Sequence, residues 1–284
     1  QALKRWALNK RNENQDASDV TPAVIRRWVV AATAEYSPKT VQNTFAVLSQ
    51  IFKQAQLDGR IDANPCSGIK RPKVTRNPDL LVLDAAQVMA MAEEAGRYRA
   101  AVLLMALAGL RWSEMAGLQR RDVNLDTGEI FVRRQLQEVK GVLTPGLPKH
   151  DKIRRVPIPA QLAQALAPLL DGEPTGLVMT TPAGTALRVG NARRDWFNAA
   201  AEAVGAPGLT PHDLRHTYAS LAVQAGANPK QLQEAMGHHS ASFTLDVYAS
   251  LFASDLHRLG QTLDTLFSTA RGQNVVTNET RPVA

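Results

Sequence analysis

The stretch from Tyr98 to Ala108 is apolar on almost every side of a helix, and such a helix must be buried all round. It predicts the centre of a globular domain, which a chain of 284 residues with 44% hydrophobic residues can build around it. Gly109 ends the helix and Arg111 follows two residues later, so its guanidinium is held rigidly at a buried helix end. Because a buried Arg is rare unless it is paired, Glu114 is its expected partner. The pattern fits a purely structural ion pair as well as a binding site.

Net positive charge is concentrated in the first quarter of the chain. Residues 1–76 contain 13 Lys and Arg against 6 Asp and Glu, which accounts for the whole net charge of +7, while residues 77–284 contain 20 of each kind. A basic module joined to a neutral one is typical of a clamp for a polyanion such as DNA. Charge alone fits a solvated basic surface without a partner equally well.

Two helices are predicted in the basic module. Thr21–Pro22 begins one that runs to about Glu35, and Ser37–Pro38 begins a second that ends near Gly59. One face of the second helix is apolar. Its opposite face, and the basic extended segment that follows, carry side chains suited to phosphate and base-edge contacts, although an ordinary solvated face has a similar composition. We predict DNA contacts from Lys39, Gln42, Asn43, Lys53, Lys70, Arg71 and Lys73.

Strand character follows, with apolar runs at 129–134, 142–143 and 153–158. We predict that the polar segment between the last two is a hairpin tip presenting Lys149 and Lys152, although most hairpin lysines only add solubility. Helices resume at about 160–170 and 191–204. The predicted fold is mainly α with a small antiparallel β-sheet. Its parts are a helical domain (1–76), a linker (77–83), a mixed α/β domain (84–268) and a C-terminal tail (269–284).

The segment from Thr210 to Tyr248 carries the densest set of candidate site residues. Pro211 begins a helix with His212 in its first turn and Arg215 three residues later on the same face. The free N–H groups of the helix N-terminus lie nearby. This combination predicts a site that binds an oxyanion.

Two further histidines lie in this segment. His216 follows His212 by one helical turn, a spacing that suits a metal in principle, but no carboxylate or Cys completes a ligand set, so we predict no metal. Gly237 ends the next helix and presents His238 just beyond it. Tyr248 follows ten residues later.

Three sequence boxes together give a specific resemblance. They are Ala108–Glu114 (AGLRWSE), His212–Thr217 (HDLRHT) and Met236–His238 (MGH), with Tyr248 after them. Their order and spacing resemble the tyrosine recombinase (phage-type integrase) family, over about residues 1–268. Met236 departs from the usual Leu, and His239 is a second candidate beside His238. The helical domain is then similar to that family's core-binding domain, and residues 84–268 to its mixed catalytic domain.

The resemblance implies a role for each candidate residue. Tyr248 would attack a scissile DNA phosphate and form a 3′-phosphotyrosine. Arg111 and Arg215 would bind the non-bridging oxygens as charge builds up, and His238 would donate a further hydrogen bond. Lys149 is the best match for the amine that protonates the departing 5′ oxygen.

Lys152 is the alternative amine, and His212 would accept the tyrosine proton or hold the phosphate. Clustered cations are needed because a phenol with a pKa of about 10 is otherwise unreactive at neutral pH. Neither metal nor ATP should be required, because the phosphotyrosyl bond keeps the phosphodiester energy. The family implies double-stranded DNA attachment sites as substrate and a homotetramer on DNA acting through a Holliday junction. Accessory DNA-bending or directionality factors are further expected partners.

Other properties of the chain indicate its cellular compartment. Cys66 is its single Cys, which excludes an internal disulfide framework and fits a reducing compartment. The longest apolar run, 100–110, is too short to span a bilayer, and no signal peptide is visible. We therefore expect a cytoplasmic protein of a bacterial host, associated with the nucleoid.

Competing functions fit the sequence less well. A DNA-binding protein without catalysis would not need Tyr248. A small-molecule phosphotransferase would need a Gly-rich phosphate loop such as G-x-x-x-x-G-K, which the sequence lacks. A type IB topoisomerase shares the chemistry, but the boxes resemble integrases more closely.

Overall fold

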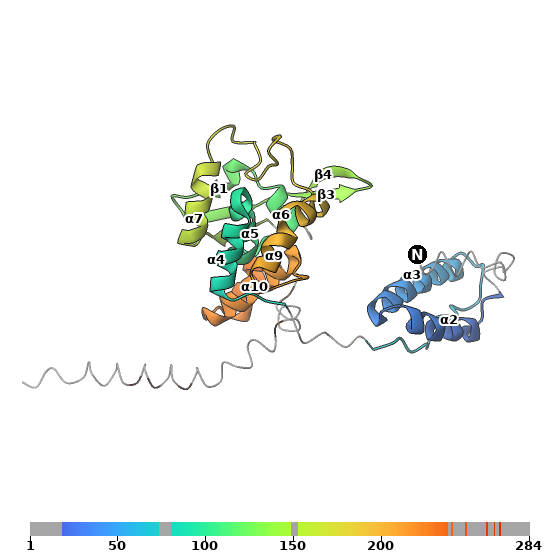
Figure 1. Cartoon of the computed structure of the whole chain (residues 1–284). Helices are drawn as coiled ribbons and strands as arrows, with labels where there is room; N and C mark the ends of the chain where they lie inside the picture. Colours follow the sequence, from blue (N-terminus) through green and yellow to red (C-terminus); the bar gives the residue numbers. More distant parts are fainter. Residues whose placement is uncertain are drawn as a thin grey trace, which may run out of the picture. The chain divides into compact units, whose positions relative to one another are not determined.

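The computed structural model describes residues 19–73, 81–148 and 153–237, and the single residues 240, 248, 260, 264 and 267. The chain divides into two compact units, Gln1–Pro78 and Asp79–Ala284. The colours of Figure 1 follow the sequence through both units. The predicted end of the helical domain at 76 falls within residues 74–80, which lie outside the described residues, and the predicted start of the second domain at 84 follows them. Within the described part, no helix is both long enough and apolar enough to cross a membrane.

The N-terminal unit is built on helices α2 (Pro22–Glu35) and α3 (Pro38–Leu57) (Figure 1). Ser37 caps α3, because its hydroxyl accepts a hydrogen bond from the Thr40 backbone N–H at 3.3 Å. Apolar side chains at helical spacing form the core: Ile25, Trp28, Val29, Ala32, Val41, Phe45, Leu48 and Phe52, with Cys66. The helices therefore run as the sequence predicts.

Helix α5 (Arg99–Leu107) forms the centre of the C-terminal unit. Every residue from Ala100 to Ala106 is buried, as expected for a helix that is apolar all round. It packs against α4 (Ala85–Glu94), α7 (Ala160–Leu166) and α10 (Pro211–Gln224) (Figure 1). The elements that follow it therefore begin from a fixed position in the core.

The remaining helices lie around this centre. Helix α6 (Trp112–Ala116) follows α5 after a short turn, and α11 (Pro229–Met236) follows α10. The helix expected at 191–204 is present as three consecutive helical segments, one of them a π-helix. These are α8 (Val189–Ala192), a π-helical turn at Arg193–Phe197 and α9 (Asn198–Ala203). The predicted mainly helical class is confirmed.

The β structure forms two small antiparallel sheets. Strands β1 (Val123–Asn124), β2 (Glu129–Val132) and β5 (Arg154–Pro157) make one sheet, and β3 (Gln135–Val139) pairs with β4 (Val142–Gly146) in the other. Figure 1 shows the β3–β4 hairpin projecting from the body of the unit.

The expected pairing of 142–143 with 153–158 is wrong. Strand β4 pairs with β3 through a two-residue turn at Lys140–Gly141, where both residues have positive φ, and β5 pairs with β2. Strands β4 and β5 therefore belong to different sheets and do not form one hairpin. Lys149 and Lys152 themselves lie outside the described residues.

Candidate active site

A capping box fixes the start of α10. The Thr210 hydroxyl accepts a hydrogen bond from the Asp213 backbone N–H at 3.3 Å, and the Asp213 carboxylate accepts one from the Thr210 N–H at 2.8 Å. With Pro211 at the first position, the helix begins where the sequence predicts. His212 is exposed in the first turn, whereas Arg215 is only 1% exposed.

The guanidinium of Arg215 joins two helix ends. It donates hydrogen bonds to the carbonyl of Gly109, just after α5, and to the carbonyl of Met236, at the end of α11. Helix C-termini leave such carbonyls without partners inside the helix, so a buried cation is stabilised there. Burial and the nearby charge of Arg111 lower the pKa of Arg215 to about 9, and the group stays charged at neutral pH.

Arg111 approaches the same place from the other side. Its Nη1 donates to Glu114 Oε1 at 2.7 Å, and its Nη2 donates to the carbonyl of Gly237 at 3.3 Å. The expected partner Glu114 is therefore present, and it is 1% exposed. Burial raises the pKa of this carboxyl, but a hydrogen bond and the charge of Arg154, with the charges of Arg111 and Arg215, lower it to about 2.

The two guanidinium groups thus converge although they lie far apart in the sequence. Met236 and Gly237 are neighbours, and their carbonyls accept from Arg215 and Arg111 respectively. The two positive charges lie close together, and each guanidinium is fixed by hydrogen bonds to protein acceptors. Such a pair is suited to bind a ligand that carries negative oxygen atoms.

Tyr248 lies against α10. Its hydroxyl is 2.7 Å from Nδ1 of His216, and its side chain is 1% exposed. Burial raises the pKa of Tyr248 to about 12, and the charge of Arg215 offsets part of this effect. The phenol is therefore neutral at pH 7, and it lies close enough to Arg215 for the guanidinium to stabilise the phenolate when the proton leaves.

His216 is the residue that sequence reasoning missed. Its ring meets that of His212 edge-on at 4.7 Å between centroids. Burial, followed by the influence of His212, lowers the pKa of His216 to about 4, so its ring is neutral at pH 7 and Nδ1 can accept the phenol proton. Desolvation by the groups packed around its ring, followed by the charge of Arg215, also lowers the pKa of His212. The signal was present in the sequence, since His212, Arg215 and His216 share one helical face, but the spacing was considered only for a metal.

The other predicted residues have varied positions. His238 and His239 lie outside the described residues, as do Lys149 and Lys152. In the N-terminal unit, Gln42 is half-buried and donates a hydrogen bond to the carbonyl of Pro72 at 2.9 Å, so it holds the basic segment on α3. The remaining predicted DNA contacts are all exposed: Lys39, Asn43, Lys53, Lys70, Arg71 and Lys73.

A groove with a volume of about 470 Å³ opens beside Arg111 and His212. The β3–β4 hairpin and the segment before α8 form its other walls, through Leu136, Leu143, Leu187 and Arg188. Arg188 links these walls by donating to Glu138 Oε1 at 2.6 Å and to the Gly141 carbonyl at 2.9 Å.

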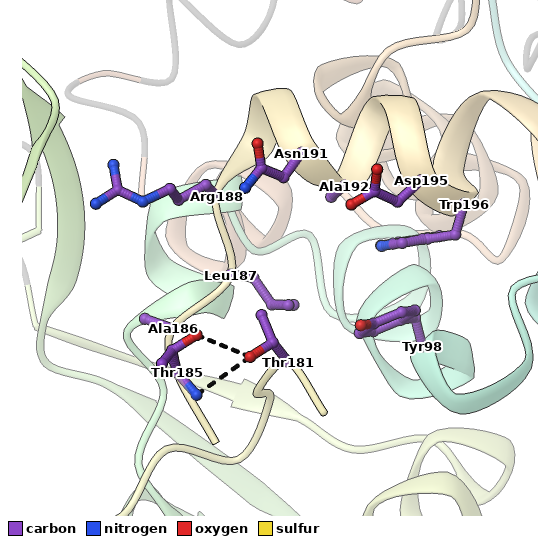
Figure 2. Close-up of a pocket in the computed structure, with 10 residues that line it drawn as sticks. All are labelled: Tyr98, Thr181, Thr185, Ala186, Leu187, Arg188, Asn191, Ala192, Asp195 and Trp196. Carbon is purple, nitrogen blue, oxygen red and sulfur yellow. Dashed lines mark hydrogen bonds between the residues drawn. The ribbon is translucent and has the colours of Figure 1, made fainter. Parts of the chain in front are cut away.

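A smaller pocket of about 130 Å³ shares Leu187 and Arg188 with this groove (Figure 2). Tyr98 stacks on Trp196 there at 4.8 Å, and the hydroxyls of Thr181 and Thr185 are hydrogen-bonded. Among the described residues that line it, none is a predicted catalytic residue, whereas Arg111 and His212 line the larger groove, which is therefore the candidate reaction site.

Comparison with known proteins supports these observations. Residues 81–254 match the family model described as the phage integrase family. A putative prophage phiRv2 integrase of Mycobacterium tuberculosis is 31% identical over 238 residues, which cover 81% of this chain. The chain spans only 63% of the length of that relative. The tyrosine recombinase XerC of Mycobacterium leprae is 30% identical over 253 residues, covering 82% of this chain and 80% of that protein.

Solved structures share the fold. A variant of the Tn1549 transposon integrase, in complex with a circular intermediate DNA, matches with a TM-score of 0.75 at 22% identity, covering 90% of this chain and 91% of that one. A lambda integrase dimer bound to a core site matches with a TM-score of 0.62 at 20% identity, covering 85% of each chain.

Proposed function

Because the chain belongs to the phage integrase family, we propose that it is a site-specific DNA recombinase that cuts and rejoins strands through a 3′-phosphotyrosyl intermediate. The observation that carries the proposal is the convergence of Arg111 and Arg215 on the end of α11, close to the buried phenol of Tyr248. A protein that only binds DNA needs no such pairing of a phosphate-binding pocket with a phenol.

Arg111 and Arg215 bind the two non-bridging oxygens of the scissile phosphate. Both guanidinium groups are already held by carbonyls and by Glu114, so they do not have to reorganise as charge develops on the pentacoordinate phosphorus. His212, exposed at the start of α10, contributes a further hydrogen bond to the phosphate.

Tyr248 supplies the nucleophile. Its oxygen forms a bond to phosphorus while the bond from phosphorus to the 5′ oxygen breaks, and the phenol proton passes to His216 Nδ1. The negative charge of the bound phosphodiester raises the proton affinity of this imidazole, which burial and then the neighbouring His212 lower in the free protein. We thus assign the proton-accepting role, first expected of His212, to His216.

The departing 5′ oxygen takes a proton from Lys149, with Lys152 as the alternative, and His238 donates to the phosphate. The phosphotyrosyl linkage preserves the phosphodiester energy, so religation needs no ATP. The N-terminal unit holds the duplex through Lys39, Asn43, Lys53, Lys70, Arg71 and Lys73. The substrate is a pair of DNA attachment sites, joined in a homotetramer through a Holliday junction, to integrate or excise a phage or other mobile element in the cytoplasm. Accessory DNA-bending or directionality factors select the direction.

Covalent trapping tests this function. The chain is incubated with a nicked attachment-site duplex, mapped from the junctions of the element that encodes it, and SDS-resistant, protease-sensitive adducts are counted. The wild type should form the adduct and Tyr248→Phe should not. His216→Asn keeps an acceptor for the phenol but cannot take its proton, so the adduct should form about 10²-fold more slowly.

Tyr218→Phe is the matched control, because Tyr218 is the other phenol packed near Arg215. This variant should form the adduct at the wild-type rate. An adduct that survives Tyr248→Phe and disappears in Tyr218→Phe would assign the nucleophile to Tyr218, and no adduct from the wild type would contradict the proposed function.

A further inference from the structure

A third guanidinium is buried beside the candidate active site, and no role has been assigned to it above. Arg154, the first residue of β5, is 8% exposed. Its Nη1 and Nη2 donate to the two carboxylate oxygens of Glu114 at 2.9 and 2.7 Å, and its Nε donates to the carbonyl of Ala235 at 2.7 Å. The planar guanidinium of Arg154 thus connects α6 and α11, which are far apart in the sequence.

The carboxylate of Glu114 is fully used. Oε1 accepts from Arg111 Nη1 and Arg154 Nη1, while Oε2 accepts from the Arg111 backbone N–H and Arg154 Nη2. An ionised carboxylate offers about four lone-pair directions, so each has a donor here. Because Arg154 donates to both oxygens, it fixes the orientation of the Glu114 carboxylate toward Arg111.

The other end of Arg154 reaches the end of α11. The carbonyls of three successive residues there accept from three different arginines: Ala235 from Arg154, Met236 from Arg215 and Gly237 from Arg111. Glycine is required at the last of these positions, Gly237, for two reasons. Its φ is +62°, and a Cβ atom would lie 3.1 Å from Arg154 Cδ and 3.2 Å from its Nη1. The turn that leads into His238 is therefore packed directly on Arg154.

We propose that Arg154 is a positioning residue for strand cleavage, because it fixes both Glu114 and the end of α11 and so aims the guanidinium of Arg111 and the turn before His238. It does not touch the DNA. The inference rests on the proposed function and deepens it, since it states what makes the phosphate-binding pair rigid. A displacement of reacting groups by about 1 Å can cost about 10²-fold in rate, so a residue with this position can control cleavage without contacting the substrate.

Arg154→Lys is the informative substitution. Lysine keeps the positive charge that Glu114 needs, but its single amine cannot span both carboxylate oxygens and the Ala235 carbonyl. At saturating DNA, single-turnover adduct formation should fall about 10²-fold, whereas DNA binding should not change. Arg155→Lys is the matched control on the same strand, because the Arg155 side chain is 68% exposed and pairs with Glu129 at 3.7 Å. It should cleave like the wild type.

A modified substrate separates positioning from general damage to the fold. A methyl group replaces one non-bridging oxygen of the scissile phosphate and removes its negative charge, so the aim of Arg111 matters less. The defects of Arg154→Lys and Arg111→Lys should then shrink by a similar factor. A defect of the same size on both substrates would mean that Arg154 serves only in a structural ion pair, and it would overturn the proposal.

The remaining outcomes are also distinct. A wild-type adduct that Arg154→Lys forms equally fast overturns the positioning role alone. No adduct from the wild type overturns the proposed function, and the positioning role with it. If Arg154→Lys does not fold, the paired variant Arg154→Met with Glu114→Gln removes both buried charges together and must show the same cleavage defect.

Discussion

The two units of the molecule use their cations in opposite ways. In the C-terminal unit, Arg154 and Arg215 are buried and Arg111 is partly buried, and all three donate to carbonyls at the end of α11. In the N-terminal unit, Lys39 and Lys53 lie exposed on α3. Burying a charge costs several kcal/mol unless fixed partners offset it, whereas an exposed lysine costs almost nothing. A rigid charge suits a reaction centre, and a solvated charge suits adjustable contact with a phosphate backbone.

Arg215→Lys should give the largest effect and tests the rigid half of this comparison. A lysine cannot bridge the carbonyls of Gly109 and Met236 together, so adduct formation should fall by about 10²- to 10³-fold. One buried carbonyl left without a donor should cost about 1–3 kcal/mol in the free energy of unfolding. Single-turnover cleavage and urea unfolding measure the two effects. Lys230→Arg, at an exposed position of α11, should change neither, and a wild-type cleavage rate for Arg215→Lys would remove Arg215 from the reaction centre.

Glu114→Gln tests whether the buried network makes the C-terminal unit sensitive to acid. The pKa of Glu114 is lowered from 4.5 to about 2 in the folded protein, so its ionised form stabilises the fold fully above about pH 4.5. This stabilisation is lost as the pH falls toward 2. The shift corresponds to roughly 3 kcal/mol.

Unfolding of the wild type and of Glu114→Gln should therefore be compared from pH 7 down to pH 2. The difference in unfolding free energy between the two should narrow below pH 4.5. A difference that stays constant over this range would mean that the carboxyl titrates normally, and that the network does not hold it ionised.

Local sequence information accounts for most of the fold. The helix at 98–108 was predictable because an all-round apolar pattern has only one stable environment, and Thr210 and Pro211 mark the start of α10 by capping chemistry alone. The β3–β4 pairing was missed although Lys140–Gly141 is a two-residue turn. Its flanking residues, Val139 and Val142, are both exposed, so no alternating pattern marked the strands.

The residues of the site could be predicted only where they belong to a recognisable sequence motif. Arg111 and Arg215 follow from their boxes, but the sequence around Arg154 gives no sign that its partners are Glu114 and Ala235. His216 shares a helical face with His212 and Arg215, but that spacing does not identify its partner Tyr248, which lies 32 residues further along the chain. Such roles depend on side chains that only the tertiary fold brings together.

The smallest effect concerns the exposed cations, and it tests the other half of the comparison. In the full chain, Lys39→Gln with Lys53→Gln removes two proposed phosphate contacts, so the slope of log K against log salt should become shallower by about 2. Affinity should fall most at low salt. Cleavage at saturating DNA should stay at the wild-type rate, because neither lysine belongs to the reaction centre.

Lys230→Gln is the control, since Lys230 is exposed on α11 and already paired with Glu234 at 3.1 Å. It should leave the salt slope unchanged. If the double variant alters cleavage at saturation but not the salt slope, the N-terminal lysines do not act as solvated phosphate contacts. The contrast between a rigid site and an adjustable binding face would then fail, because cations of both units would act on the chemical step.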